Sequence, residues 1–417
     1  MNRFKPISIS LSPNVEKDDV KLALNLIIRP WLWNRTAGIS ELEDEFKKYL
    51  KVKHAISFNS GRSSLLAILK SLNLESKSEV ILQAFTCNAA SNPILWLGLQ
   101  PVYADCNKEN FNIDINSIKS RIGEKTKVLL TQNTFGLPVN MDEILQVTAK
   151  NNLILIEDCA HALGAEWKGQ KMGTFGKAGF FSFSRDKVIS SVYGGMAVTN
   201  DDELAKNLRQ AQKEFGQPGI FWIFQQLLHP ILLHFMILPI YNFFNAGKIL
   251  LVFSQWAYIL SKAVHWKEKR GQRPDYFPKA LPGALAVLAL HQLHKIDKFH
   301  AHRRKIFEYY ADELKKTSFD LPENFQNGKQ SYLRFTVKHP KAHDIIYEAW
   351  HKQNILLGDW YTTVIAPFDT KLSEMDYKKG SCKNAEYLSD VTLNLPTHIN
   401  ITQKDAERIV KFLANAD

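Results

Sequence analysis

The chain has 417 residues, of which 45% are hydrophobic and 23% charged, a composition typical of a folded globular protein that is too long for one ordinary core. Lys and Arg (53) outnumber Asp and Glu (42), and the net charge of +11 favours an anionic partner, although no nucleic-acid motif accompanies the excess. The four cysteines have no paired spacing, so we expect a reducing compartment, no disulfide framework and no metal site. The first twenty residues hold no long apolar stretch, which predicts a cytoplasmic protein without a secretory signal.

Apolar runs and helical patterns alternate through the first half of the chain. The spacing of Leu and Ile predicts helices over 40–50, 61–72 and 141–152. Short, nearly continuous apolar runs predict strands that are buried on both faces of a sheet, at 54–60, 79–85, 101–105, 127–133 and 152–158. This order predicts an α/β domain with a mostly parallel sheet, which we place at residues 1–215.

The pattern changes after about residue 215. Residues 219–260 contain one charged side chain, Lys248, and a basic stretch follows them. We therefore predict a hydrophobic and basic insertion over 216–279. The helical pattern returns over 285–314, and the mixed pattern after it predicts a smaller α+β C-terminal domain, which with its connecting helix covers 280–417.

Two interpretations of the insertion are open. It is either a buried helical hairpin at a subunit interface or a segment that lies in the plane of a membrane surface. Gln, His and Pro interruptions disfavour a spanning helix, which needs about 20 apolar residues. We favour the surface interpretation for residues 219–273, with the protein peripheral on the inner face of the membrane, because aromatic rings suit the interface and basic side chains suit anionic headgroups. The aromatic residues are Trp222, Tyr241, Trp256, Tyr258 and Trp266, and the basic residues are Lys262, Lys267, Lys269, Arg270 and Arg273.

Three features at strand ends indicate a candidate site. Asp158 ends the apolar run "LILIED", where a carboxylate is costly unless it meets a cation or a strong donor. Ser60 and Gly61 stand at a strand-to-helix turn, where backbone N–H groups can bind an anion. Lys187 follows the apolar run "GFFSFS". Ligands of parallel sheets sit at the carboxyl ends of the strands, and these three groups suit pyridoxal 5'-phosphate, which needs a phosphate cradle, a carboxylate at its ring nitrogen and a lysine at its aldehyde.

The segment 157–209, with "EDCAHALGA", "FFSFSRDK" and "YGG" in this order, resembles the DegT/StrS-type sugar aminotransferases. The resemblance extends upstream to "ISELEDEFKKYL" and resumes at "HQLHKIDKFHAHRRK" and in the C-terminal segment, so that it covers about three quarters of the chain. It implies the fold-type I architecture of pyridoxal-phosphate enzymes, with Lys187 as the Schiff-base lysine and proton carrier and Asp158 facing the pyridine nitrogen. It further implies that His161 contacts the phenolic oxygen or the ring, and that Ser182 and the turn of Ser60, Gly61 and Arg62 hold the phosphate.

The activity that the resemblance implies is transamination of a keto sugar, linked to a nucleotide or a lipid carrier, with an amino acid such as glutamate as donor and a homodimer as the working form. A membrane location would favour the lipid-linked substrate. Two alternatives stay open. Sugar dehydratases of this kind replace the lysine, and Lys187 disfavours them here. A non-catalytic, regulatory and membrane-associated relative is the other.

Three positions depart from the family pattern. Cys87 stands where the family has an aromatic residue stacked on the cofactor ring, so stacking is weaker or the neighbouring Phe85 takes over. Arg62 replaces a threonine and could pair with the phosphate. The region before "HQLHKID" lacks the Asn that, in the family, reaches the cofactor phosphate of the neighbouring subunit, and we expect Arg62 to compensate for it.

Overall fold

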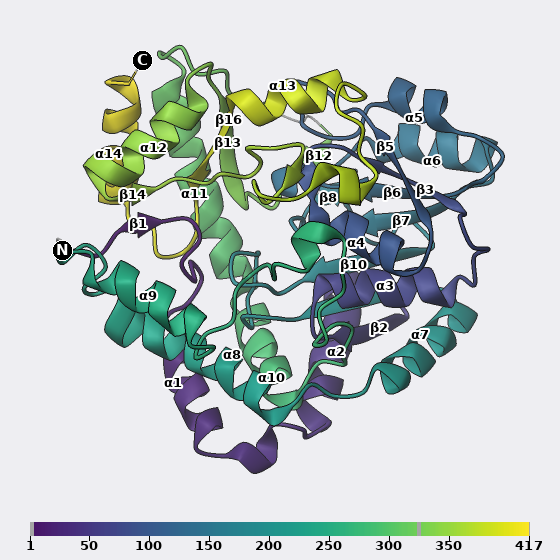
Figure 1. Cartoon of the computed structure of the whole chain (residues 1–417), viewed down its shortest axis with the longest axis horizontal. Helices are drawn as coiled ribbons and strands as arrows, with labels where there is room; N and C mark the ends of the chain where they lie inside the picture. Colours follow the sequence, from purple (N-terminus) through teal and green to yellow (C-terminus); the bar gives the residue numbers. More distant parts are fainter. Residues whose placement is uncertain (1–3, 323–326, 417) are drawn as a thin grey trace.

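A seven-stranded sheet forms the centre of the large domain in the computed structural model, which describes residues 4–322 and 327–416 (Figure 1). In spatial order its strands are β2 (His54–Phe58), β11 (Gly195–Thr199), β10 (Ala178–Ser182), β7 (Ile154–Asp158), β6 (Thr126–Gln132), β3 (Glu79–Gln83) and β5 (Gln100–Ala104). Strand β11 runs in the direction opposite to that of the other six strands, which are parallel to one another. The predicted α/β class and mostly parallel sheet are confirmed, and every strand predicted in the first half lies in this sheet.

Both faces of the sheet are covered by helices, which explains the continuous apolar runs. In β10, Phe180 packs into the core on one face, and Phe181 packs into the core on the other, as the two-residue period of a strand requires. The core on the Phe181 face contains side chains of α2 (Ala37–Leu50), α5 (Ile115–Arg121), α6 (Met141–Lys150) and α10 (Gly283–Leu293). The core on the Phe180 face contains side chains of α3 (Gly61–Ser71), α4 (Asn88–Trp96) and α7 (Asp202–Phe215).

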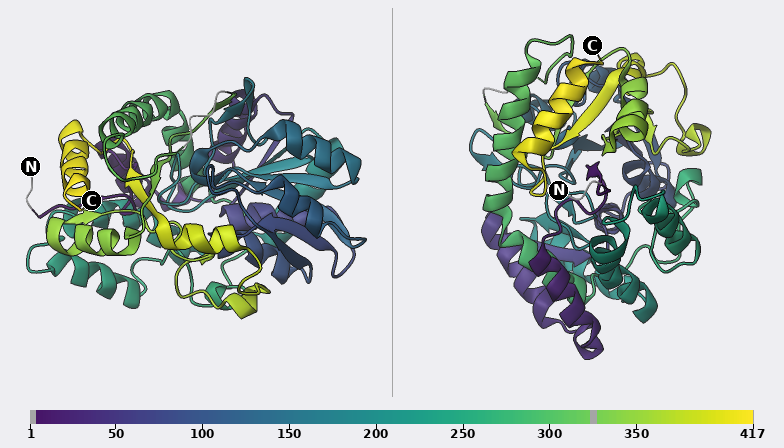
Figure 2. Two further views of the ribbon diagram at one scale, coloured as in Figure 1. Left: turned by 90° about the horizontal axis from the view of Figure 1, so that it is seen from above. Right: turned by 90° about the vertical axis from the view of Figure 1, so that its left-hand side faces the viewer.

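The C-terminal domain has a core of its own. Its core contains side chains of α11 (Ile296–Leu314), β13 (Arg334–Lys338), α12 (Ala342–Gln353), β16 (Thr392–Pro396) and α14 (Gln403–Ala414), and β13 pairs with β16 in antiparallel register. Helix α13 (Lys383–Val391) packs Ala385 and Leu388 into the core of the large domain instead. The prediction of one helix over 285–314 is wrong in one respect, because this segment forms two helices that are separated at residues 294–295. The first of them, α10, packs in the core of the large domain. The N-terminal β1 (Ile7–Ser8) pairs with β14 (Ile355–Leu356), so the chain start joins the second domain (Figure 2).

The insertion folds as two helices at the side of the large domain, drawn in teal at the lower left of Figure 1. Helix α8 (Ile220–Leu232) packs against α1 (Lys17–Ile27) and α10, and it continues as a wider turn to Ile237. Helix α9 (Ala246–Trp256) follows, and a small apolar cluster lies between the two. The stretch Ile220–Ile237 is long and apolar enough to cross a membrane, and half of it is buried within the chain.

Candidate active site

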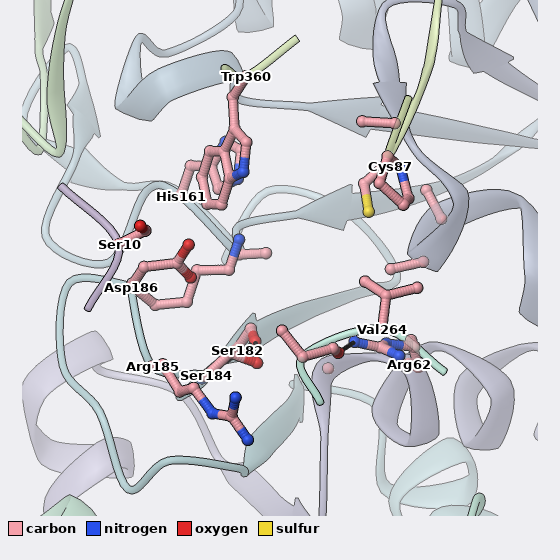
Figure 3. A pocket seen from close by; sticks show the side chains of 18 of the residues that line it. Ser10, Arg62, Cys87, His161, Ser182, Ser184, Arg185, Asp186, Val264 and Trp360 are labelled. Carbon is pink, nitrogen blue, oxygen red and sulfur yellow. Dashed lines mark hydrogen bonds between the residues drawn. The ribbon is translucent and has the colours of Figure 1, made fainter. Parts of the chain in front are cut away.

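The strand ends that the sequence singles out meet at one edge of the sheet. Strands β2, β10 and β7 end there, and β11 begins there, with Gly195 opposite both Phe58 and Ser182. A cavity of about 440 Å³ opens at this edge (Figure 3). Seven of the predicted site residues line it: Gly61, Arg62, Cys87, Asp158, His161, Ser182 and Lys187.

Lys187 lies in a turn between β10 and β11, and its ammonium group faces the cavity. Burial lowers the pKa of Lys187, although the nearby Asp186, Cys87 and Asp158 oppose this change. Its Nζ lies 4.2 Å from the ring centroid of Trp360. The side-chain amide of Asn14 donates to the Lys187 carbonyl, which fixes the backbone of the turn. A partly desolvated lysine of lowered pKa is a suitable nucleophile.

Asp158 ends β7 and is 8% exposed. Burial raises the pKa of this carboxyl group to about 6, while a hydrogen bond from the Ala160 N–H and the charge of Lys187 act in the opposite direction. The Ala160 N–H lies 2.9 Å from Asp158 Oδ1. Among the described residues, the backbone N–H of Ala160 is the donor to this carboxylate, and a cationic group in the cavity would stabilise its charged form.

His161 is a neutral hydrogen-bond donor. Its Nδ1 accepts from the backbone N–H of Phe135 at 3.2 Å, which leaves the ring proton on Nε2. Burial lowers the pKa of His161 well below its ordinary value, and the charges of Lys187 and Arg334 add to this. The ring stacks on Trp360 with centroids 4.8 Å apart (Figure 3).

The turn from β2 into α3 lines another part of the cavity with Gly61 and Arg62, and we call this part the α3 end. Ser60 caps α3, since its Oγ accepts from the Ser63 N–H at 3.0 Å, and it does not itself line the cavity. Gly195 lets this turn approach β11, because a Cβ there would lie 2.5 Å from the nitrogen of Gly61. Ser182 and Ser184 line the cavity beside this turn, and their hydroxyl groups are 3.1 Å apart. The arrangement presents the helix N-terminus and two hydroxyl groups to an anion.

Cys87 and Arg62 mark departures from the family pattern. Cys87 lines the cavity, and burial raises the pKa of its thiol. The idea that Phe85 takes over ring stacking is wrong, because Phe85 is fully buried against Phe111 and Tyr361 and does not line the cavity. Arg62 also lines the cavity, where its guanidinium forms an ion pair with Glu268 of the insertion.

Other residues of the cavity lie far from the segment 157–209 in the sequence, and no sequence pattern predicts their place in the site. Trp360 and Tyr361 come from the C-terminal domain and bring aromatic rings into the cavity. The guanidinium carbon of the buried Arg334, on β13, lies 3.3 Å from the Trp360 ring centroid, and its Nη2 lies 3.3 Å from Asp186. Arg185 stands two residues before Lys187, but the sequence alone does not tell whether it faces solvent or the cavity.

The insertion carries an unusual share of exposed apolar side chains. Of the 23 large apolar residues that are exposed among those the structure describes, 14 lie in it: Ile220, Phe221, Phe235, Met236, Ile240, Phe243, Phe244, Ile249, Val252, Phe253, Trp256, Tyr258, Ile259 and Trp266. The prediction that Trp222 and Tyr241 face a membrane is wrong, because these side chains are 9% and 5% exposed.

Comparison with known proteins gives one consistent result. The model of the DegT/DnrJ/EryC1/StrS aminotransferase family matches residues 14–220 and 280–414. The chain is 26% identical to GDP-perosamine synthase of Caulobacter vibrioides over 99% of both chains. It is 26% identical to UDP-N-acetyl-3-dehydro-alpha-D-glucosamine 3-aminotransferase of Acidithiobacillus ferrooxidans over 89% of this chain and 86% of that one. Its fold is similar to that of Helicobacter pylori PseC, an aminotransferase involved in the biosynthesis of pseudoaminic acid, with a TM-score of 0.76 at 23% identity over 99% of each chain.

Proposed function

Because this chain belongs to the DegT/DnrJ/EryC1/StrS aminotransferase family, we propose that it is a sugar aminotransferase that uses pyridoxal 5'-phosphate to convert a keto sugar into an amino sugar. Relatives that act on nucleotide-linked sugars support the keto-sugar substrate. The observation that carries the proposal is the meeting of Lys187, Asp158 and the α3 turn around one cavity. An amino acid such as glutamate is the donor, and amino-sugar or polysaccharide biosynthesis is the setting.

The residues present fit this cofactor. At the α3 end, the Nε of the buried Arg185 has no hydrogen-bond partner among the described residues, and a bound anion would supply one. At the other end, the buried Asp158 would gain a counter-ion from a protonated ring nitrogen. When bound, the cofactor supplies an electrophilic aldehyde and an electron-withdrawing ring. Asp158, His161, Ser182, Gly61 and the arginines would hold it.

The chain's own groups then have separate tasks. Lys187 would hold the cofactor through its nucleophilic Nζ, and the same Nζ, as a free amine, would take a proton from the donor's α-carbon and later return one to the sugar carbon. The Nε2–H of His161 orients an oxygen acceptor in the cavity. Trp360 covers Lys187 and His161 and keeps water from the nitrogen that moves the proton.

The donor half-reaction tests this function without knowledge of the sugar. Incubation of the cofactor-loaded protein with L-glutamate should release one equivalent of 2-oxoglutarate for each bound cofactor, and the visible spectrum should change in parallel. The same assay with a panel of other amino acids identifies a different donor. Failure of every amino acid to produce a keto acid, with cofactor bound, would favour the non-catalytic alternative.

We also propose that the protein is peripheral on an anionic membrane through the insertion, and that its working form is a homodimer. Exposed rings of Trp256, Tyr258 and Trp266 lie near exposed basic side chains, and Lys262, Arg270 and Arg273 have no ion-pair partner among the described residues. Aromatic rings with cationic neighbours suit the headgroup region of a bilayer. A sugar on a polyprenyl phosphate would then be as accessible as one on a nucleotide.

Replacement of Ile249, Phe253 and Trp256 by Ser should lower partition to vesicles that contain anionic phospholipid at least about tenfold, since a buried large apolar side chain contributes about 1.5–3 kcal/mol. Flotation measures the bound fraction. Trp31→Ser, which removes a 67% exposed indole elsewhere, is the control. Equal flotation of the wild type and of both variants would contradict the proposal that the insertion binds a membrane. Dissociation of an oligomer in the triple variant would instead favour the interpretation of the insertion as a subunit interface.

A further inference from the structure

A segment of the insertion forms part of the active-site wall. Residues 261–271, which we call the strap, follow α9 and run past the α3 end of the cavity. The strap belongs to residues 221–279, which lie outside both segments that the family model matches. Even so, Gln255 of α9 and Lys262, Ala263 and Val264 of the strap line the cavity. Figure 3 shows Val264 beside Arg62.

Four buried side chains of the large domain hold the strap. Arg185 Nη2 donates to both the carbonyl and the hydroxyl oxygen of Ser261, each at 2.7 Å. The Tyr193 hydroxyl group donates to the carbonyls of Lys262 and Ala263. Arg62 donates to the Ala263 carbonyl at 3.0 Å and pairs with Glu268. Further along, Asn92 donates to the Glu268 carbonyl at 3.0 Å.

The charges at this end of the cavity do not balance. Arg62 and Arg185 are 8% and 9% exposed, and the charge of Arg62 adds to the burial that lowers the pKa of Arg185. Glu268, which is fully buried, neutralises Arg62. Arg185 has no carboxylate within salt-bridge distance among the described residues, and the nearby Asp186 is paired with Arg334. One buried guanidinium is therefore uncompensated beside Ser182, Ser184 and the N-terminus of α3, and a phosphate monoester dianion has the charge to complete this set.

We propose that the strap fixes Arg185, and Arg62 beside it, as the guanidinium groups of the cofactor-phosphate site, so that one chain closes this end of the site without a residue from a second chain. Arg185 is the new phosphate-binding residue, and Tyr193 and Glu268 are positioning residues. The inference rests on the proposed function, because it needs the cofactor to bind through Lys187.

Comparison of pyridoxal 5'-phosphate with pyridoxal, which lacks the phosphate, isolates this site. We expect Arg185→Gln to lower the affinity for pyridoxal 5'-phosphate about 10–100-fold, the loss of a charge-assisted hydrogen bond, and to change the affinity for pyridoxal less than about threefold. Absorbance titration and the rise in melting temperature at saturating ligand both report binding. Arg29→Gln, an exposed arginine outside the cavity, is the matched control and should leave both affinities unchanged.

Tyr193→Phe tests the strap itself. It removes the hydroxyl group that holds the strap but no charge of the cavity. We therefore expect the affinity for pyridoxal 5'-phosphate, divided by the affinity for pyridoxal, to fall about 3–10-fold. Tyr310→Phe is the matched control, since it removes another buried phenol, which donates to Pro396 at 3.1 Å in the C-terminal core. Equal loss of both ligands in Tyr193→Phe would reduce its role to general stability and overturn the role of the strap.

The titrations are repeated over a series of protein concentrations, with mass photometry on the same samples. A site closed within one chain has the same affinity at every concentration. An affinity for pyridoxal 5'-phosphate that rises together with subunit association would overturn the proposal. Failure of the proposed function is distinguishable, because neither pyridoxal nor its phosphate would then form a borohydride-reducible adduct with Lys187.

Discussion

The Lys187→Ala variant is expected to lose turnover by at least about 10⁴-fold, because it removes both the nucleophile and the proton carrier of the reaction. Lys262 is the other amine among the residues that line the cavity, but it is exposed, whereas Lys187 is half-buried. The arginines of the cavity stay protonated, and His161 is not an amine. The variant should retain affinity for the cofactor through Asp158 and the phosphate end, since these contacts do not involve the lysine.

The visible absorption spectrum of the purified protein is the measurement, followed by borohydride reduction and peptide mapping. The wild type should show a near-visible band that reduction fixes to Lys187, and the variant should lack it. Lys168→Ala, which removes an exposed lysine paired with Asp142, is the control and should keep the band. A wild-type protein without any band after addition of pyridoxal 5'-phosphate would leave the non-catalytic alternative in place.

The sequence predicted those parts of the site that follow directly from strand ends. Asp158 ends an apolar run, and Lys187 follows another, so the topology of a parallel sheet brings them together without further information. The α3 turn is predictable for the same reason. Family resemblance then assigned roles to these positions, and the geometry at the cavity is consistent with those roles.

Residues that reach the site over long sequence distances could not be predicted in this way. Trp360 stacks on His161 from the C-terminal domain, and Glu268 pairs with Arg62 from the insertion. Neither has a periodicity or motif of its own, because its position depends on how separate elements pack. Arg62 illustrates the consequence: the sequence suggested an arginine that compensates alone for a missing phosphate donor, whereas in the structure its charge is shared with a buried carboxylate.

The apolar composition of the insertion predicted its unusual character but not which side chains are exposed. Trp222 packs inward beside Tyr193, whereas Trp256 faces outward, and hydropathy alone does not distinguish them. The same insertion carries the exposed apolar residues of α9 and, a few residues later, the strap. The insertion therefore contributes both to the surface and to the wall of the cavity.

The Asp158→Asn variant should be more stable than the wild type without cofactor and much less active with it. An amide cannot hold the positive charge of a ring nitrogen, and loss of one such electrostatic contact lowers turnover about 10²–10³-fold. In the cofactor-free chain, by contrast, the buried carboxylate destabilises the fold when it is charged. Asn keeps the shape and the acceptor for the Ala160 N–H but carries no charge.

The pH dependence of stability separates these effects. The pKa of Asp158 in the folded chain, about 6, lies above its ordinary value of 3.8, so the folded state binds this proton more tightly than the unfolded state. The stability that this proton contributes is fully present below about pH 4 and is lost as the pH rises through 6. Urea unfolding of the cofactor-free proteins should therefore give nearly equal free energies near pH 4, and at pH 8 the variant should be more stable by about 1–3 kcal/mol. Glu157, whose pKa burial raises to about 7, titrates in both proteins and cancels in the difference. A variant that is less stable than the wild type at pH 8 would show that Asp158 already has a cationic partner within the chain, and the cavity would then not need a protonated ring nitrogen at that position.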